Sequence, residues 1–197
     1  MDEKALIDAA RRGDVGSFNQ LVLSYQSMAY NLAYRILSDR DAAADATQDA
    51  FLSAFKAMGK FRGGSFKAWL LRIVTNACYD QLRLKQRRPA TSLDALLVLE
   101  PAPVQSLTDP GESPEEYAVR QELRGAIQVG IGILPPEQRI ALVLSDVQGL
   151  SYQEIAEVTG ASLGTVKSRL SRARSKLRDF LLEQRELLPS RYRLKNE

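Results

Sequence analysis

A chain of 197 residues can form one large or two small domains, and a hydrophobic fraction of 45% argues against wholesale disorder. The chain has no histidine, which excludes the commonest general base. Its single cysteine, Cys78, excludes an intramolecular disulfide and a cysteine-cluster zinc site. The net charge is only +3, so the distribution of charge along the chain is more informative than its sum.

No apolar run reaches the length of a membrane span, and the polar, amphipathic start MDEKALIDAARRGD does not resemble a signal peptide. We therefore expect a cytoplasmic protein without membrane insertion. We expect no cofactor and no metal, and we interpret Cys78 as a small helix residue rather than a redox group.

Helical periodicity dominates the sequence, and no stretch alternates over several residues as a β-strand would. The expected helices span residues 3–12, 15–37, 41–58, 66–87, 115–134, 136–147, 151–158 and 163–185. Prolines recur between Pro89 and Pro114, where they exclude a continuous helix. We therefore expect an all-α fold of two small helical domains joined by a flexible linker. The expected boundaries are a first domain at 1–90, an acidic Pro-rich linker at 91–114, a second domain at 115–186 and a tail at 187–197.

The helix expected at 41–58 has one buried face and one exposed face. Its buried residues are expected to be Ala44, Thr47, Phe51, Phe55 and Met58. Its outer stripe consists of Asp45, Gln48, Asp49 and Leu52. An exposed leucine ringed by carboxylates is typical of a protein-docking face, although single exposed leucines are common on any surface. The pattern alone leaves both interpretations open.

A basic loop, Lys60-Phe61-Arg62-Gly63-Gly64-Ser65, precedes the helix expected at 66–87. The inward stripe of this helix is Phe66, Leu70, Ile73 and Ala77, with Trp69 at its edge in a core role. A second stripe consists of Arg72, Asn76, Tyr79 and Arg83. Cations contact phosphates, an amide contacts a base edge and a ring stacks on a base. Loop and stripe together predict a nucleic-acid surface able to hold an unstacked base, with a solvated amphipathic helix as the alternative.

Charge is segregated along the chain. Basic residues dominate positions 60–88, where Asp80 is the only acid. All charges at 91–116 are acidic, and all charges at 160–178 are basic. Two basic blocks separated by an acidic one predict two nucleic-acid surfaces joined by a segment that avoids them.

Residues 150–178 carry the pattern of a helix-turn-helix. Ser151 and Glu154 form a capping-box sequence, S-x-x-E. Gly160 supplies the turn, because a helix C-terminus favours a residue that tolerates positive φ, and Ser162 can cap the next helix. The buried stripe of that second helix is expected to be Val166, Leu170, Ala173 and Leu177.

The opposite face of this second helix carries small serines flanked by cations. The residues expected to contact DNA are Thr165, Lys167, Ser168, Arg169, Ser171, Arg172 and Arg174. A major groove admits such a helix, with phosphates on both walls and base edges on its floor. Because the cap, the turn, the apolar stripe and the charges agree, the segment favours DNA binding over a merely solvated basic helix. Upstream, Gly125, Gly130 and Gly132 indicate close helix packing or a weakened helix.

With these motifs in order, the chain resembles the extracytoplasmic-function (ECF) group of bacterial sigma factors, in the sigma-70 family. The matching stretches are DATQDAFLSAFKAMGKFRG, FKAWLLRIVTNACYDQLR, LPPEQRIALVLSDVQGLSYQEIAEVTG and GTVKSRLSRARSKLR. They cover nearly the whole length, in the order of the family. The departures are the Gly130 and Gly132 pair and a long, acidic, Pro-rich linker.

The resemblance implies partners and a role for each surface. It implies that Asp45, Gln48, Asp49 and Leu52 lie on the helix that binds the clamp helices of the largest subunit of core RNA polymerase, while the second domain meets the flap of the second-largest subunit. It implies that the first basic surface melts and reads the −10 promoter element and that the helix-turn-helix reads the −35 element. It also implies control by an anti-sigma factor. The acidic linker has two interpretations: its negative charge would mimic nucleic acid inside the polymerase, or it is an ordinary solvated linker.

Two other classes of protein compete with this interpretation. A conventional helix-turn-helix regulator would bind duplex DNA without being a polymerase subunit. An enzyme acting on DNA, such as a small recombinase, needs a nucleophile and an acid–base cluster, and the sequence carries no such constellation. We therefore expect a chain that is not an enzyme.

Overall fold

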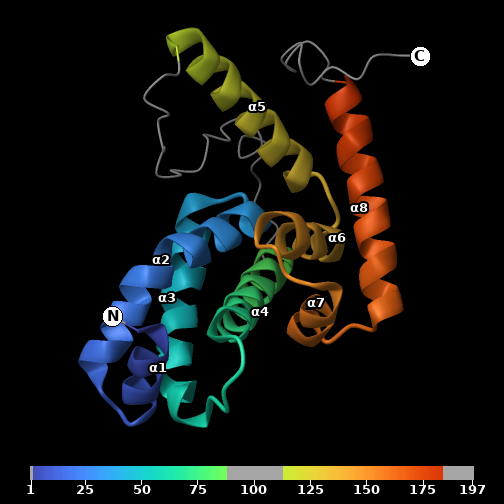
Figure 1. Cartoon of the computed structure of the whole chain (residues 1–197). Helices are drawn as coiled ribbons and strands as arrows, with labels where there is room; N and C mark the ends of the chain where they lie inside the picture. Colours follow the sequence, from blue (N-terminus) through green and yellow to red (C-terminus); the bar gives the residue numbers. More distant parts are fainter. Residues whose placement is uncertain (1, 88–112, 184–197) are drawn as a thin grey trace.

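The computed structural model describes residues 2–87 and 113–183, and these residues form helices without any strand (Figure 1). The first group of helices is α1 (Glu3–Arg11), α2 (Val15–Leu37), α3 (Arg40–Ala57), the 3₁₀ turn η1 (Met58–Lys60) and α4 (Phe66–Arg87). The second group is α5 (Pro114–Gly132), α6 (Pro136–Leu142), the π-helical turn η3 (Val143–Val147), α7 (Tyr152–Thr159) and α8 (Leu163–Glu183). The expected all-α fold is confirmed. Most of the expected linker and the whole expected tail lie outside the described residues, and so does most of the acidic block.

Aspartates begin the first three helices. The carboxylates of Asp2, Asp14 and Asp39 accept hydrogen bonds from the backbone N–H groups of the first turns of α1, α2 and α3, at 3.2, 2.9 and 3.1 Å. Each bond satisfies a donor that has no partner inside its helix. The bonds from Ser17 hold the pKa of the Asp14 carboxyl below its usual value. These caps fix where the N-terminal helices begin.

The buried face of α3 differs from the expected one. The fully buried residues of α3 are alanines, Ala43, Ala46, Ala50 and Ala54. Ala44 is exposed and Phe55 is 44% exposed, so those two expectations were wrong, while Met58 is buried and Thr47 and Phe51 are half-buried. A stripe of alanines lets α3 lie close to α2 and α4, and Phe55 instead packs edge-on against Phe18 at the rim.

The inward face of α4 is broader than the expected stripe. Phe66 and Leu70 are buried as expected, whereas Ile73 and Ala77 are only half-buried. The centre of the core is instead formed by Leu71, Val74, Thr75 and Cys78. Burial raises the pKa of the Cys78 thiol to about 12, which agrees with its interpretation as a packing residue.

In the second domain α5 and α8 cross closely. A Cβ atom at Gly130 would lie 2.6 Å from Leu177 Cδ1 and 2.8 Å from Phe180 Cδ1. The absence of a side chain at Gly130 therefore permits the contact, which confirms the close-packing interpretation for that glycine. Gly125, by contrast, faces open space.

The two domains pack against each other, with α7 beside α4 (Figure 1). One link is Arg139 of α6, whose guanidinium donates to the backbone carbonyl of Ile36 in the first domain at 2.5 Å, and also to the carbonyls of Leu134 and Gly132 in its own domain. Lys67 Nζ of α4 donates to the carbonyl of Gln148 at 2.6 Å. These contacts set the position of the second domain relative to the first.

Candidate nucleic-acid interfaces

The first basic surface begins at the turn between η1 and α4. Gly63 and Gly64 have φ of +92° and +87°, a conformation that side chains rarely adopt, so the turn requires glycine. Ser65 Oγ accepts a hydrogen bond from Ala68 N at 3.1 Å and thereby caps α4. The expected DNA contact at Ser65 therefore falls on a residue that also fixes the start of the helix.

An aromatic cluster of Phe61, Phe66 and Trp69 packs against the inner side of this loop. Phe61 is buried, and its ring centroid lies 5.2 Å from that of Trp69 and 5.8 Å from that of Phe66. Trp69 is half-buried and packs against the core cluster, as expected, but it also forms part of a cavity wall. The cluster holds the loop in one conformation and leaves the basic side chains on its outer side.

That cavity, of about 470 Å³, lies over the loop. The first domain lines it with loop residues 60–65 and with Ala68, Trp69 and Arg72, and α7 lines it with Glu154, Glu157 and Val158. Its basic residues are Lys60, Arg62 and Arg72, and all three are exposed. A cavity with cations and an aromatic ring in its walls suits a base and its phosphate.

The stripe expected along α4 is present on one face. Arg72, Asn76 and Arg83 are exposed, and Arg83 Nη1 lies 3.2 Å from Asp80 Oδ1. Tyr79 is half-buried instead. Burial, followed by the charge of Glu137, raises the pKa of its phenol, and the cations Arg169 and Arg83 oppose that rise. Tyr79 therefore lies in the electrostatic field of the second domain.

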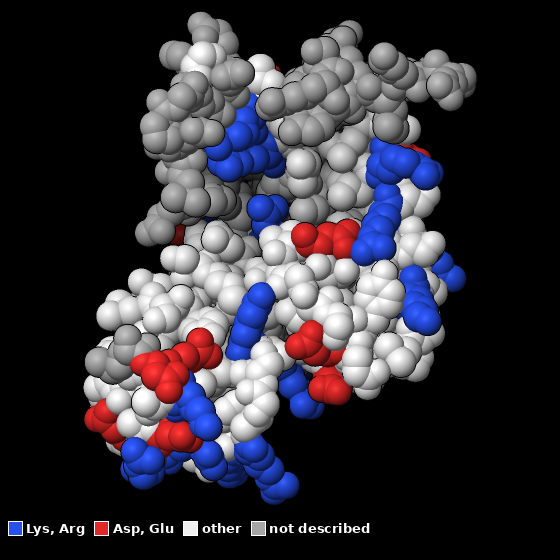
Figure 2. Space-filling model, in the orientation of Figure 1, with Lys and Arg blue, Asp and Glu red and all other residues white. Residues whose placement is uncertain are grey.

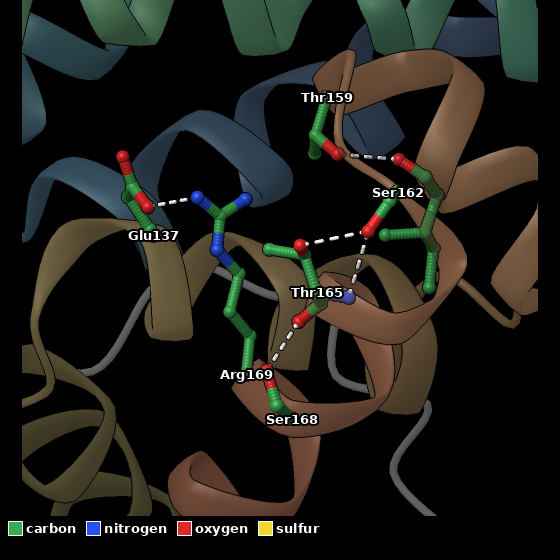
Figure 3. A network of polar contacts seen from close by, with 7 residues as sticks. Glu137, Thr159, Ser162, Thr165, Ser168 and Arg169 are labelled. Carbon is green, nitrogen blue, oxygen red and sulfur yellow. Dashed lines mark hydrogen bonds and ion pairs between the residues drawn. The ribbon is translucent and has the colours of Figure 1, made fainter.

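The helix-turn-helix forms as the sequence predicts. Ser151 Oγ accepts from Glu154 N at 3.3 Å while Glu154 Oε2 accepts from Ser151 N at 2.8 Å, which completes the capping box. Gly160 ends α7 with φ of +66°, and Ser162 Oγ accepts from Thr165 N at 3.1 Å to begin α8 (Figure 3). Val166, Leu170 and Ala173 are buried and Leu177 is half-buried, as expected.

The outer face of α8 is basic, and Figure 2 shows cationic side chains spread along this helix. Lys167, Ser171 and Arg172 are exposed. Thr165 and Ser168 are half-buried and bonded within the first turns, Thr165 to Ser162 and Ser168 to the Thr165 carbonyl (Figure 3). Lys167, Ser171 and Arg172 are therefore available to a DNA groove.

Two of the expected arginines are engaged by acids of the second domain. Arg169 forms an ion pair with Glu137 of α6, and only 20% of its side chain is exposed (Figure 3). Arg174 donates to both oxygens of Asp146, at 3.0 and 2.6 Å, and these bonds keep the pKa of the Asp146 carboxyl low. Arg174 therefore links α8 to the π-helical turn η3 and positions α8, the recognition helix of the helix-turn-helix.

The expected docking stripe on α3 is entirely exposed. Asp45, Gln48 and Asp49 are exposed, and 52% of Leu52 is accessible. Beside them a groove of about 420 Å³ runs between α2 and α3, mostly apolar in its walls. Gln48 belongs to both the stripe and the groove, and the buried Oδ1 of Asn31 in the groove wall has no hydrogen-bond partner. Such a face suits a protein partner with a polar group near an apolar side chain.

Sequence reasoning missed several residues at these surfaces. Arg139 and Lys67 bond to backbone carbonyls, which carry no residue signature, so no pattern could have paired them. Glu157 lies on the solvent side of a short helix and gives no signal by itself. The ring of Trp69 could have been found, because a tryptophan beside a basic loop is a common nucleic-acid contact.

None of the helices in the described residues combines the length and the apolarity that crossing a membrane requires. In the same residues no group of acidic, histidine or cysteine side chains is arranged to hold a metal ion.

The fold and the basic surfaces define a helical DNA-binding protein with a helix-turn-helix in its second domain and a basic surface on its first domain.

Comparison with known families specifies this class. The model of sigma-70 region 2 matches residues 21–88, and the model of sigma-70 region 4 matches residues 124–177. The first match contains the α3 stripe and the basic loop, and the second contains the helix-turn-helix. The chain belongs to the sigma-70 family of RNA polymerase sigma factors, in its ECF group.

The similarity to curated sigma factors extends over most of the chain. The chain is 38% identical to the RNA polymerase sigma-H factor of Pseudomonas aeruginosa, covering 87% of this chain and 90% of the relative. It is 34% identical to the ECF RNA polymerase sigma-E factor of Escherichia coli, covering 88% and 91%. It is 37% identical to the ECF sigma factor SigE of Mycolicibacterium smegmatis over 84% of this chain, but it spans only 62% of that longer relative.

Two solved structures with this architecture are complexes of a similar chain with another protein. The sigma factor RpoE of Bartonella quintana, in complex with the anti-sigma factor NepR, superposes with a TM-score of 0.65 at 29% identity, covering 85% of this chain and 98% of that one. CnrH, in complex with the cytosolic domain of CnrY, superposes with a TM-score of 0.64 at 28% identity, covering 91% and 96%.

Proposed function

We propose that this chain binds core RNA polymerase, directs it to a specific set of promoters and helps to open the DNA there. The observation that carries the proposal is the presence of two separate basic surfaces on one chain, one within the region 2 match and one within the region 4 match. A protein that only recognises duplex DNA needs the helix-turn-helix alone. The first surface, with its loop cavity and the aromatic cluster beneath it, suits DNA whose bases are unstacked.

We assign the first surface to the −10 element and the second to the −35 element. Lys60, Arg62, Arg72, Asn76 and Arg83 are exposed along the loop and α4, which supports contact with an opened strand. Lys167, Ser171 and Arg172 are exposed on α8, which supports contact with duplex DNA in a major groove. Arg174 acts as a positioning residue, because its guanidinium is bonded to Asp146.

We assign polymerase docking to the α3 stripe. Exposed carboxylates beside an exposed leucine and a largely apolar groove suit a basic, amphipathic helical partner, the chemistry expected of the clamp helices of the largest subunit. The second domain would contact the flap of the second-largest subunit. Bond-making chemistry then belongs to the polymerase, and this chain works as a non-enzymatic subunit in the cytoplasm, where promoters and polymerase meet.

Control by an anti-sigma factor is part of the same proposal. The similar sigma factor RpoE of Bartonella quintana is bound to the anti-sigma factor NepR in its solved structure, which supports this proposal. The exposed apolar side chains of the first domain, among them Leu23 at 67% and Leu52 at 52% exposure, offer a surface for such a partner.

Transcription in vitro tests the proposal. Core polymerase, fragmented genomic DNA of the source organism and the chain are combined, and the 5′ ends of the transcripts are sequenced. The expected result is a set of start sites that share −10 and −35 sequences and that disappear when either protein is omitted. If the chain alone binds such promoters tightly and core polymerase adds nothing, a conventional helix-turn-helix regulator is the correct class.

A further inference from the structure

The groove between α2 and α3, which lie side by side in the first domain, has the dimensions of a ligand site (Figure 1). Its volume of about 420 Å³ falls within the range of sites that hold small organic molecules. On α3 the groove is lined by Ala44, Gln48 and Phe51, which share one face at helical spacing. Ala44 is exposed and contributes only a methyl group, which leaves room between the two helices.

The wall of this α2–α3 groove carries no charge. All the described residues that line it are neutral. The carboxylates of Asp45 and Asp49 lie on the same helix, but they belong to the exposed stripe and not to the groove wall. An anion in the groove would lie near these acids without a cation in the wall, and a cation would lose water there without a partner. The groove therefore favours a neutral ligand.

Aromatic rings form part of both walls. Tyr30 comes from α2 and Phe51 comes from α3, and both side chains are half-buried. The Tyr30 ring stacks on the ring of the buried Tyr34, with centroids 6.3 Å apart and an angle of 13° between the planes. This stacking fixes the orientation of Tyr30 before any ligand binds. Rings that are already held in place favour a flat, rigid partner, because little conformational freedom is lost on binding.

Side-chain amides supply hydrogen-bonding groups from both helices. Gln26 and Asn31 of α2 and Gln48 of α3 lie in the groove wall, and each amide has donors and an acceptor. The Oδ1 of Asn31 is buried without a hydrogen-bond partner, which is an unfavourable arrangement. Rotation about the terminal torsion of asparagine is easy, so this oxygen can turn toward the groove and accept a donor there without losing an existing bond. Thr47, by contrast, already donates to the carbonyl of Ala43 at 2.6 Å.

From these features we propose that the α2–α3 groove binds a neutral, planar heteroaromatic molecule with a lactam-like edge, and that this ligand competes with polymerase docking. The ring system packs against Tyr30 and Phe51, and the N–H of the lactam donates to Asn31. Gln48 belongs to both the groove and the docking stripe, so a ligand in the groove changes the surface offered to the polymerase. The competition rests on the proposed function, whereas the binding itself does not.

Quinolin-2-one, a neutral bicyclic lactam, is the probe for binding to the full-length chain. Backbone and side-chain amide resonances are followed by NMR during the titration. We expect saturable shifts confined to α2 and α3, including the side-chain amides of Asn31 and Gln48, with a Kd of about 0.1–1 mM for a ligand of this size. The N-methyl analogue of the probe lacks the donor and should bind about fivefold more weakly. Quinoline-2-carboxylate and the N-methylquinolinium cation should bind more weakly than quinolin-2-one, because each carries a charge.

Two substitutions test which residues form the site. Ala44→Phe places a ring in the groove from an exposed position and should weaken the binding of quinolin-2-one about tenfold. The matched control is Ala5→Phe, the same change at an exposed position of α1 outside the groove, and it should bind the probe as wild type. Asn31→Leu keeps the approximate size of the side chain and removes the amide, so it should abolish the preference for quinolin-2-one over its N-methyl analogue. Circular dichroism reports whether each variant is folded.

The affinity for core polymerase tests the competition. The fluorescently labelled chain is titrated with core polymerase and read by anisotropy, with and without quinolin-2-one. At a probe concentration about ten times its Kd, the affinity of wild type for polymerase should fall about tenfold. Asn31→Leu, which should bind the probe about fivefold more weakly, should lose only about threefold at the same concentration. Each loss is measured against the same variant without the probe, so an effect of the substitution on docking itself does not enter the comparison.

The outcomes separate the ligand site from the function. Absence of saturable shifts in α2 and α3, equal binding of the N-methyl analogue to wild type, or tighter binding of either charged probe would overturn the proposed ligand class. Equal weakening by Ala44→Phe and Ala5→Phe would place the ligand outside the groove, and if Ala44→Phe does not fold, Asn31→Leu decides alone. Binding in the groove without any loss of polymerase affinity would overturn the competition. A wild-type chain that does not bind core polymerase would overturn the proposed function, while the NMR titration still decides the ligand site.

Discussion

Arg139 shows how much one side chain can contribute when its partners are backbone carbonyls. Its guanidinium bonds to Ile36 of the first domain and to Leu134 and Gly132 of the second, and burial lowers its pKa. Helix C-termini leave carbonyls without partners inside the helix, and a cation there is favoured by the helix dipole as well. One residue thus completes the end of α2 and joins two domains.

Truncating Arg139 should therefore be costly. Arg139→Ala leaves several buried carbonyls without a donor, and we expect the free energy of unfolding to fall by about 2–3 kcal/mol. Arg139→Lys should recover part of the loss, because an ammonium reaches fewer of the carbonyls. Denaturant titration followed by circular dichroism measures the change. Arg172→Ala, at an exposed position, is the control, and an equal loss there would contradict the assignment.

Cys78 should be nearly inert in the folded chain. Its thiol is buried and its pKa is raised to about 12 from 9.0, because burial disfavours the thiolate. The raised pKa means that the folded state keeps the proton while the unfolded state loses it, so stability falls as pH rises from 9.0 toward 12. Alkylation by iodoacetamide at pH 8 should be slow in buffer and fast in denaturant. Fast alkylation of the native chain would show that Cys78 is accessible.

At the scale of elements, the sequence predicted helices well and one buried face poorly. Caps, turn glycines and prolines mark the ends of helices by local chemistry, and the helix-turn-helix was recovered residue by residue. In α3 the aromatic rings suggested the wrong face, because alanines lie on several sides of the helix and carry little hydrophobic signal. Which alanines are buried depends on how closely α2 and α4 approach, and this is a property of the whole fold.

The glycines of α5 make a further test at this scale. Gly130→Leu would force a side chain into Leu177 and Phe180, and we expect destabilisation by about 1–3 kcal/mol. Gly125→Ala should instead stabilise the helix by about 0.5–1 kcal/mol, because its Cβ meets open space and alanine restricts the unfolded chain. Thermal unfolding of both variants measures the two changes in stability, which should have opposite signs. Equal effects of the two substitutions would show that α5 and α8 do not cross at Gly130.

The exposed stripe of α3 also allows a prediction of its own. Asp45→Lys combined with Asp49→Lys should abolish co-purification with core polymerase and leave the helical content unchanged, because both carboxylates are exposed. Circular dichroism and affinity co-purification measure the two effects. The control is Asp8→Lys, at a half-buried acid of α1 that lies outside the stripe and pairs with Arg11, and it should leave co-purification unchanged. Loss of helical content in the double variant would show instead that the stripe is structural.

At the scale of the whole molecule, the sequence predicted two domains and two basic surfaces but not their contact. The links at Lys67 and Arg139 end on main-chain oxygens, and Gln128 meets a short serine side chain. Such contacts depend on the path of the backbone, so they leave no periodic or charge pattern in the sequence. The composition of the cavity, cations from one domain and carboxylates from the other, emerges only when the two domains are packed.

The two surfaces should act at different steps of promoter opening. Asn76→Ala and Tyr79→Ala should impair melting more than initial recognition, because an amide and a ring contact bases best once these are unstacked. Arg172→Ala should weaken the first, closed complex, because α8 meets intact duplex, and the loss of a base-edge contact should cost about 1–3 kcal/mol. Asn76 and Arg172 are exposed, so their removal should not disturb the fold.

Two templates distinguish these steps, one fully duplex and one with a bubble already open at the −10 element. Polymerase binding and permanganate reactivity of thymines are measured on both. The bubble should largely rescue Asn76→Ala and Tyr79→Ala, because it supplies the melted strand, and it should leave the defect of Arg172→Ala in place. Tyr79 carries an additional expectation, since it is half-buried against the second domain in the free chain. The substitution of Tyr79 should therefore change the binding of free single strands even without polymerase. Rescue of Arg172→Ala by the bubble would contradict the assignment of the two surfaces to the two steps.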